Sequence, residues 1–68
     1  MKLSVIVFTN RASSHEVEIP EGSSYFDLLA FLNINPETVV VFRDGVPVPF
    51  DEKANPGKIE VMRVVSGG

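Results

Sequence analysis

The chain has 68 residues, of which 44% are apolar, and its formal net charge is −3 at pH 7. This length allows one small hydrophobic core and leaves no room for a second domain or a deep cleft between lobes. The negative charge and the six scattered basic residues disfavour direct nucleic-acid binding, because phosphate contacts need clustered Lys and Arg. The absence of cysteine excludes disulfides, thiolate metal sites and a cysteine nucleophile.

The apolar stretches of the chain are short. The longest covers residues 28–32, far from the ~20 residues that cross a bilayer. The start of the chain does not form a secretion signal, because Ser4 interrupts the apolar stretch and no small-residue cleavage site follows. We therefore expect a cytoplasmic protein without a membrane partner.

The first 19 residues predict a β-hairpin. Residues 2–9 alternate in hydrophobicity and are rich in β-branched side chains, which is typical of a strand buried on at least one face. Residues 10–14 are polar and predict a loop. Residues 15–19 alternate again, which predicts a second strand with Val17 and Ile19 pointing inward and Pro20 at its end.

A helix is predicted after this hairpin. Ser24 and Asp27 have the spacing of a capping box, so the helix should begin here, and residues 33–36 should end it. The buried stripe of the helix consists of Tyr25, Leu28, Leu29 and Leu32. Phe26 and Phe31 fall off this stripe, which leaves open whether they pack at the helix edge or form a second contact surface.

The second half of the chain predicts three more strands. Residues 38–42 form a strong strand, and Asp44-Gly45 predicts a two-residue type I′ turn. The return strand must be short and at a sheet edge, because Pro47 and Pro49 cannot donate ladder hydrogen bonds. Residues 58–65 form the last strand. Its inward residues are Ile59 and Val61, and its outward residues are Glu60 and Met62.

The element order is therefore ββαββ-β. It predicts an α+β domain of the β-grasp class, with a mixed sheet of four to five strands and one helix packed on one face. The last strand should lie in the centre of the sheet beside the first. We expect the domain to span residues 1–65 and residues 66–68 to form a flexible tail.

The titratable residues do not suggest a catalytic or metal site. His15 is the sole histidine, and a lone solvated histidine usually has no ligand role. Asp44, Asp51 and Glu52 can approach one another, but a solvated acidic edge explains them better than a cation site. The serines lack a base and an orienting group, so we expect no catalytic residue, no metal and no enzyme activity.

The remaining feature is the Gly67-Gly68 end. Glycine has no Cβ, so such an end fits a narrow channel and lets another protein's reactive atoms approach its carboxylate. Ser66 to Gly68 span at most about 10 Å when extended, which is enough to reach into a partner's active site. An incidental, frayed end is the alternative, and the pattern by itself leaves both open.

The turn at Asp44-Gly45, the strand over residues 58–65 and the final Ser66-Gly67-Gly68 resemble the ThiS/MoaD family and the ubiquitin-like small archaeal modifier proteins. The resemblance covers essentially the whole chain, and its most specific part is the last strand that ends in Gly-Gly. The fold that it implies is the ubiquitin-like β-grasp.

The resemblance also implies a chemistry at Gly68. A ubiquitin-activating-type enzyme would use ATP to adenylate the Gly68 carboxylate. A persulfide would then convert it to a thiocarboxylate that donates sulfur to thiamin, molybdopterin or tRNA, or a target lysine would attack it to form an isopeptide bond. The chain itself would bind no cofactor, and its partners would be the activating enzyme and a sulfur acceptor or target protein.

The resemblance further implies a docking surface on the last strand and on residues 39–43. Counting back from the Gly-Gly end places Phe42 and Met62 on an exposed apolar patch, with Val64 nearby. Phe42 has an alternative place in the core, because four apolar residues in a row must put some on each face. Arg63 either meets acidic groups of the activating enzyme or is a solvated strand-end residue.

A different class of function also fits the sequence. The chain would then be a non-covalent β-grasp binding module with an incidental Gly-Gly end, since one fold hosts unrelated functions. Removing Gly67 and Gly68 separates the two hypotheses, because only a carrier or modifier needs them.

Overall fold

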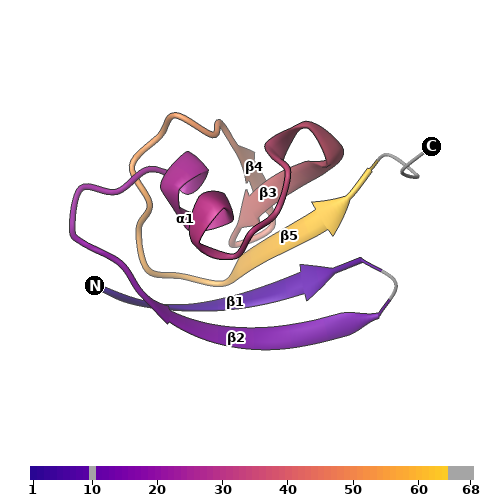
Figure 1. Ribbon diagram of the computed structural model, residues 1–68, viewed down its shortest axis with the longest axis horizontal. Coiled ribbons are helices and arrows are strands. Elements are labelled where there is room, and N and C mark those ends of the chain that lie inside the picture. Colours follow the sequence, from indigo (N-terminus) through magenta and orange to yellow (C-terminus); the bar gives the residue numbers. More distant parts are fainter. Residues whose placement is uncertain (10, 65–68) are drawn as a thin grey trace.

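The computed structural model describes residues 1–9 and 11–64. Here a five-stranded sheet carries one α-helix on one face (Figure 1). The helix α1 spans Tyr25–Phe31, and a 3-10 helix spans Pro36–Thr38. The strands are β1 (Lys2–Phe8), β2 (Ala12–Glu18), β3 (Val39–Arg43), β4 (Val46–Val48) and β5 (Ile59–Arg63).

The strand order β2-β1-β5-β3-β4 is that of the expected β-grasp. The last strand β5 lies in the centre, parallel to β1 and antiparallel to β3. The hairpins β1–β2 and β3–β4 flank this central strand on its two sides. The strand β5 is therefore paired on both of its edges.

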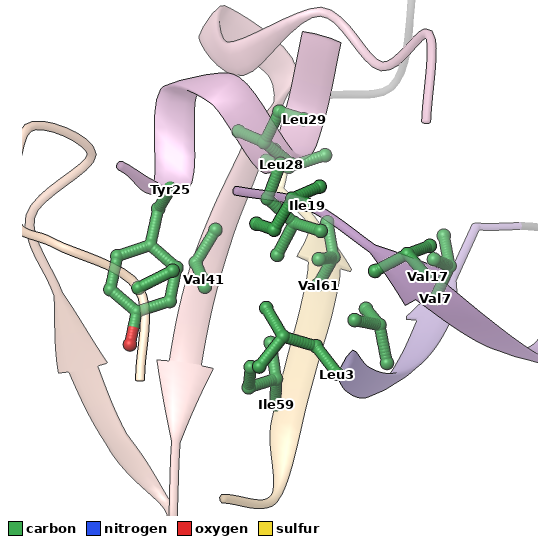
Figure 2. Close-up of a cluster of buried hydrophobic side chains, with 13 residues drawn as sticks. Leu3, Val7, Val17, Ile19, Tyr25, Leu28, Leu29, Val41, Ile59 and Val61 are labelled. Atoms are coloured by element: carbon green, nitrogen blue, oxygen red, sulfur yellow. The ribbon is translucent and has the colours of Figure 1, made fainter. Parts of the chain in front are cut away.

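The core lies between α1 and the inner face of the sheet, which we define as the face that the helix covers (Figure 2). Tyr25, Leu28 and Leu29 of α1 are completely buried, as predicted, whereas Leu32 of the predicted stripe is the C-cap of the helix and is only partly buried. They meet alternate residues of the central strands, such as Val41 and Val61. Apart from the hydroxyl of Tyr25, which accepts a hydrogen bond from the Asn55 N–H at 3.4 Å, the buried side chains of the described residues are apolar, so burial of apolar surface is the main stabilising term of this core.

The start of α1 is the predicted capping box. The hydroxyl of Ser24 accepts a hydrogen bond from the Asp27 backbone N–H at 3.2 Å, and the Asp27 carboxylate accepts one from the Ser24 N–H at 2.9 Å. These two bonds satisfy N–H groups that have no partner within the helix. The helix ends at Phe31 with Leu32 as its C-cap, and Asn33 turns the chain away with a φ of 59°.

The turn at Asp44-Gly45 also has the predicted form. Both residues have positive φ, 53° and 82°, as a type I′ turn requires. The Asp44 carboxylate accepts a hydrogen bond from the Lys58 backbone N–H at 3.0 Å, which ties the turn to the start of β5. The return strand β4 is short and lies at the sheet edge, as predicted from its prolines.

Four predicted strands have other bounds in the structure. The strand β1 ends at Phe8 and not at residue 9. The strand β2 begins at Ala12, so residues 12–14 are not a loop but pair with β1. Their small side chains are exposed at a sheet edge, where large apolar residues are not needed. The strand β3 begins at Val39 because residues 36–38 form the 3-10 helix. The strand β5 spans Ile59–Arg63, so Lys58 and Val64 are not part of it, and the predicted end at Val65 lies outside the described residues.

Candidate interaction face

Alternate residues of the strands point away from α1 and form the outer face of the sheet. The register places Met62 of β5 between Phe8 of β1 and Val40 of β3. In the next row, Glu60 of β5 lies between Ile6 of β1 and Phe42 of β3. We call the apolar members of these two rows the outer patch; they are Ile6, Phe8, Val40, Phe42 and Met62.

The outer patch is only partly shielded from solvent. Met62 is 40% exposed, and the other four members are half-buried by their neighbours in the sheet. Within residues 1–9 and 11–64, the one α-helix lies on the opposite face (Figure 1). An apolar surface that the described chain leaves without cover is typical of a contact surface for another protein.

The predicted patch residues divide between the two faces. Phe42 and Met62 share the outer face, so Phe42 is not in the core. Val64 is 58% exposed, and its backbone N–H donates to the Thr38 carbonyl at 2.9 Å. This bond continues the β3–β5 pairing by one residue, which puts Val64 on the side of Met62. Arg63 pairs with Val39 and so lies toward the inner face.

Three members of the outer patch were not predicted from the sequence: Ile6, Phe8 and Val40. Their signal was present, because residues 5–8 and 39–42 are apolar at consecutive positions and must place apolar side chains on both faces of the sheet. What was lacking was the strand order, which brings these three residues from β1 and β3 to either side of β5.

The two phenylalanines outside the helix stripe differ in their surroundings. Phe26 is 49% exposed, and its ring lies against that of Phe50 with 5.6 Å between the ring centroids. Phe26 therefore packs at the helix edge and still presents part of its ring to solvent. Phe31 is 61% exposed at the end of α1.

The first residue of the chain makes an ion pair with the edge strand. The Met1 ammonium donates to Oε2 of Glu18 at 2.7 Å and to the Ile19 carbonyl at 2.8 Å. The hydrogen bond from this ammonium is the larger cause that lowers the pKa of Glu18 below its ordinary value of 4.5, and the charge of the ammonium is the second.

The titratable groups are dispersed over the surface. His15 is exposed, and its Nε2 lies 3.0 Å from Oγ of Ser13. No cluster of three His, Asp or Glu side chains with the geometry of a cation site occurs among residues 1–9 and 11–64. Asp44 instead bonds to the start of β5 and pairs with Arg43 at 3.5 Å.

Ser66, Gly67 and Gly68, the predicted reactive tail, lie outside the described residues, as does Val65. The last described residue is Val64, which directly follows β5 beside the outer patch. In the sequence, Gly68 follows Val64 by four residues.

Within the described ranges, no helix has the length and apolar character to cross a membrane.

The fold is that of ubiquitin-like proteins. A solved structure named Caldiarchaeum subterraneum ubiquitin matches with a TM-score of 0.73 and 18% identity, covering 100% of this chain and 98% of the other. A second structure, a ubiquitin-like protein from the same hyperthermophilic archaeon, matches with a TM-score of 0.63 and 17% identity, covering 98% and 100%.

The chain belongs to the small archaeal modifier protein 2 family, whose family model matches residues 1–65. It is 30% identical to small archaeal modifier protein 2 of Haloferax volcanii over 66 residues, which are 97% of this chain and 100% of that one. It is also 46% identical to a protein of Archaeoglobus fulgidus over 68 residues, the full length of both.

Proposed function

We propose that this ubiquitin-like modifier works through the carboxylate of Gly68, which a separate ATP-dependent enzyme activates. Membership of the small archaeal modifier protein 2 family is the observation that carries the proposal. The Gly67-Gly68 sequence supports it, because a segment without side chains can enter a narrow active site.

The chemistry takes place in two steps. A Gly68 carboxylate oxygen attacks the α-phosphorus of ATP and expels pyrophosphate, which leaves an acyl-adenylate with AMP as a good leaving group. A nucleophile then attacks the carbonyl carbon and expels AMP. The activating enzyme binds the ATP, and this chain supplies the acyl group.

The nucleophile decides the outcome. A target lysine amine forms an isopeptide bond and loses a proton. An enzyme persulfide forms an acyl disulfide, and a thiol then reduces its S–S bond to release the thiocarboxylate. The first product is a modified protein, and the second is a sulfur donor for thiamin, molybdopterin or tRNA synthesis.

We propose that the outer patch, together with Val64, docks the body of the domain on the activating enzyme. Its apolar residues lie on β1, β3 and β5, and β5 leads directly toward the reactive end. Arg63 lies between Met62 and Val64 in the sequence, but it points toward the inner face. Arg63 is therefore not part of this docking surface.

Intact mass spectrometry tests the proposal. The chain is incubated with ATP, a persulfide source and the ubiquitin-activating-type enzyme of its source organism. A mass gain equal to the difference between sulfur and oxygen at Gly68 supports sulfur transfer. After trypsin, which cleaves at Arg63, a remnant of residues 64–68 on target lysines supports modification. With neither product, the proposal fails.

A truncated chain that ends at Ser66 is the matched variant. It should fold as the full chain does but give no pyrophosphate release with the activating enzyme. If the truncated chain retains its cellular role, the protein is instead a non-covalent binding module. The outer patch is the observation that favours this second function.

A further inference from the structure

The outer patch surrounds one carboxylate. Glu60 lies on the central strand β5, with Ile6 directly opposite on one side and Phe42 on the other. Neighbouring strands lie about 5 Å apart, so side chains that point the same way from paired residues are close together. Met62 follows two residues later on the same face, so apolar side chains flank Glu60 on three sides.

Glu60 has no partner of its own within the described chain. No hydrogen bond or ion pair joins its carboxylate to any residue in 1–9 or 11–64. Lys58 precedes it by two residues but is exposed and does not pair with it. Glu60 is half-buried, so its carboxylate is now stabilised by the water that still reaches this face.

Docking would remove that water. A partner that covers the outer patch with apolar side chains alone leaves an ionised carboxylate desolvated and without a hydrogen bond, which opposes binding. A partner with a basic side chain opposite Glu60 restores the hydrogen bonds. Arginine fits best, since its planar guanidinium can donate two parallel bonds to one carboxylate and is weakly hydrated.

We propose that Glu60 is a specificity-determining residue, and that the outer patch accepts an apolar protein surface that carries an arginine opposite Glu60. The carboxylate admits such a partner and rejects apolar surfaces without the basic group. This inference rests on the proposed function, because we assign the complementary surface to the activating enzyme.

Another role for Glu60 gives different expectations. A charge within an apolar face can simply keep the protein soluble. Replacing Glu60 with an uncharged residue would then leave partner binding unchanged or make it tighter. The proposal requires the opposite effect on binding.

The test compares Glu60→Gln with wild type in ATP–pyrophosphate exchange by the activating enzyme. Glu60→Gln keeps the shape of the side chain and removes its charge. The KM for the modifier should rise by about tenfold or more, since one member of a desolvated charge pair is lost. The kcat should change little, because Glu60 acts in docking and not on the Gly68 carboxylate.

The matched control is Glu16→Gln, the same change on the outer face of β2 but outside the patch. Glu16 is exposed and lies opposite Ser4, so its loss should leave KM unchanged. Salt gives an independent measurement. Higher ionic strength should raise the KM of the wild type more than that of Glu60→Gln.

The outcomes separate the two proposals. If the enzyme does not activate the wild-type chain, the proposed function fails. If it activates wild type and Glu60→Gln with equal KM, or Glu60→Gln with lower KM, the arginine inference is overturned and the proposed function stands. An equal rise in KM for Glu16→Gln also overturns the arginine inference, because the loss of any negative charge would then explain the result. A KM for wild type that is independent of salt also contradicts it.

Discussion

The two faces of the sheet carry similar apolar side chains that have different roles. In β5, Ile59 and Val61 are at most 1% exposed on the inner face, whereas Met62 is 40% exposed on the outer face. These are neighbouring residues of one strand, and the position of α1 makes the difference. An apolar residue beneath the helix stabilises the fold, and one on the open face remains available to a partner.

The faces also differ in their polar content. The inner face buries no polar or charged residue among the described ones, while the outer face has Glu60 in the middle of its apolar residues. A carboxylate on the inner face would be desolvated permanently, at a high cost in folding free energy. On the outer face the same group stays hydrated until a partner binds, so it can select that partner.

The strongest test of this comparison is Leu28→Ala on the inner face. Leu28 is completely buried, so the variant should lower the free energy of unfolding by about 2–5 kcal/mol, the usual cost of such a cavity. Urea denaturation followed by circular dichroism measures the change. A loss of less than about 1 kcal/mol would mean that this core packs loosely.

Removing the helix cap should have a smaller effect. Ser24→Ala deletes the hydroxyl that accepts the Asp27 N–H and should cost about 1 kcal/mol in the free energy of unfolding. The same denaturation experiment measures it. Ser14→Ala, at an exposed position of β2 without a capping role, is the control and should change stability by less than about 0.5 kcal/mol.

Met62→Ala sharpens the contrast between stability and recognition. Because Met62 is partly exposed, the variant should lose less free energy of unfolding than Val61→Ala at the neighbouring buried position. The KM for the modifier in pyrophosphate exchange should nevertheless rise about tenfold. A large loss of stability with an unchanged KM would mean that the outer patch stabilises the fold and does not contact the activating enzyme.

The smallest expected effect concerns the ion pair at the sheet edge. Since folding lowers the pKa of Glu18 below 4.5, the pair stabilises the fold above that pH and is lost as the pH falls through the lowered pKa. Glu18→Gln should thus melt below wild type at pH 7, and the difference should vanish in acid. A difference that is constant with pH would show that the charge is not involved.

Much of the fold could be predicted from local sequence. The capping box, the helix stripe and the Asp44-Gly45 turn depend on residues close together in the chain, and all three have the predicted form, except that Leu32 of the stripe lies just beyond the helix. The start of β2 could not be predicted in this way. Residues 12–14 look like a loop, and they form a strand only because β1 offers them a paired edge.

The candidate site was also predicted only in part, because some of its residues come together through strand pairing. Phe42 and Met62 could be predicted by counting back from the Gly-Gly end, whereas the contribution of β1 depends on which strand lies beside β5. The sequence also left open whether Phe42 lies in the core or on the outer face. Four consecutive apolar residues cannot reveal by themselves which of them the helix covers.

By itself, the sequence determined most of the local elements, the single small core, the lack of cysteine chemistry and the Gly67-Gly68 pair. Tertiary structure alone decided that Ile6 and Phe42 lie on either side of Glu60, which has no partner within residues 1–9 and 11–64. The physical reason is that strand pairing joins residues far apart in the chain, and side-chain alternation then fixes which of them face solvent together.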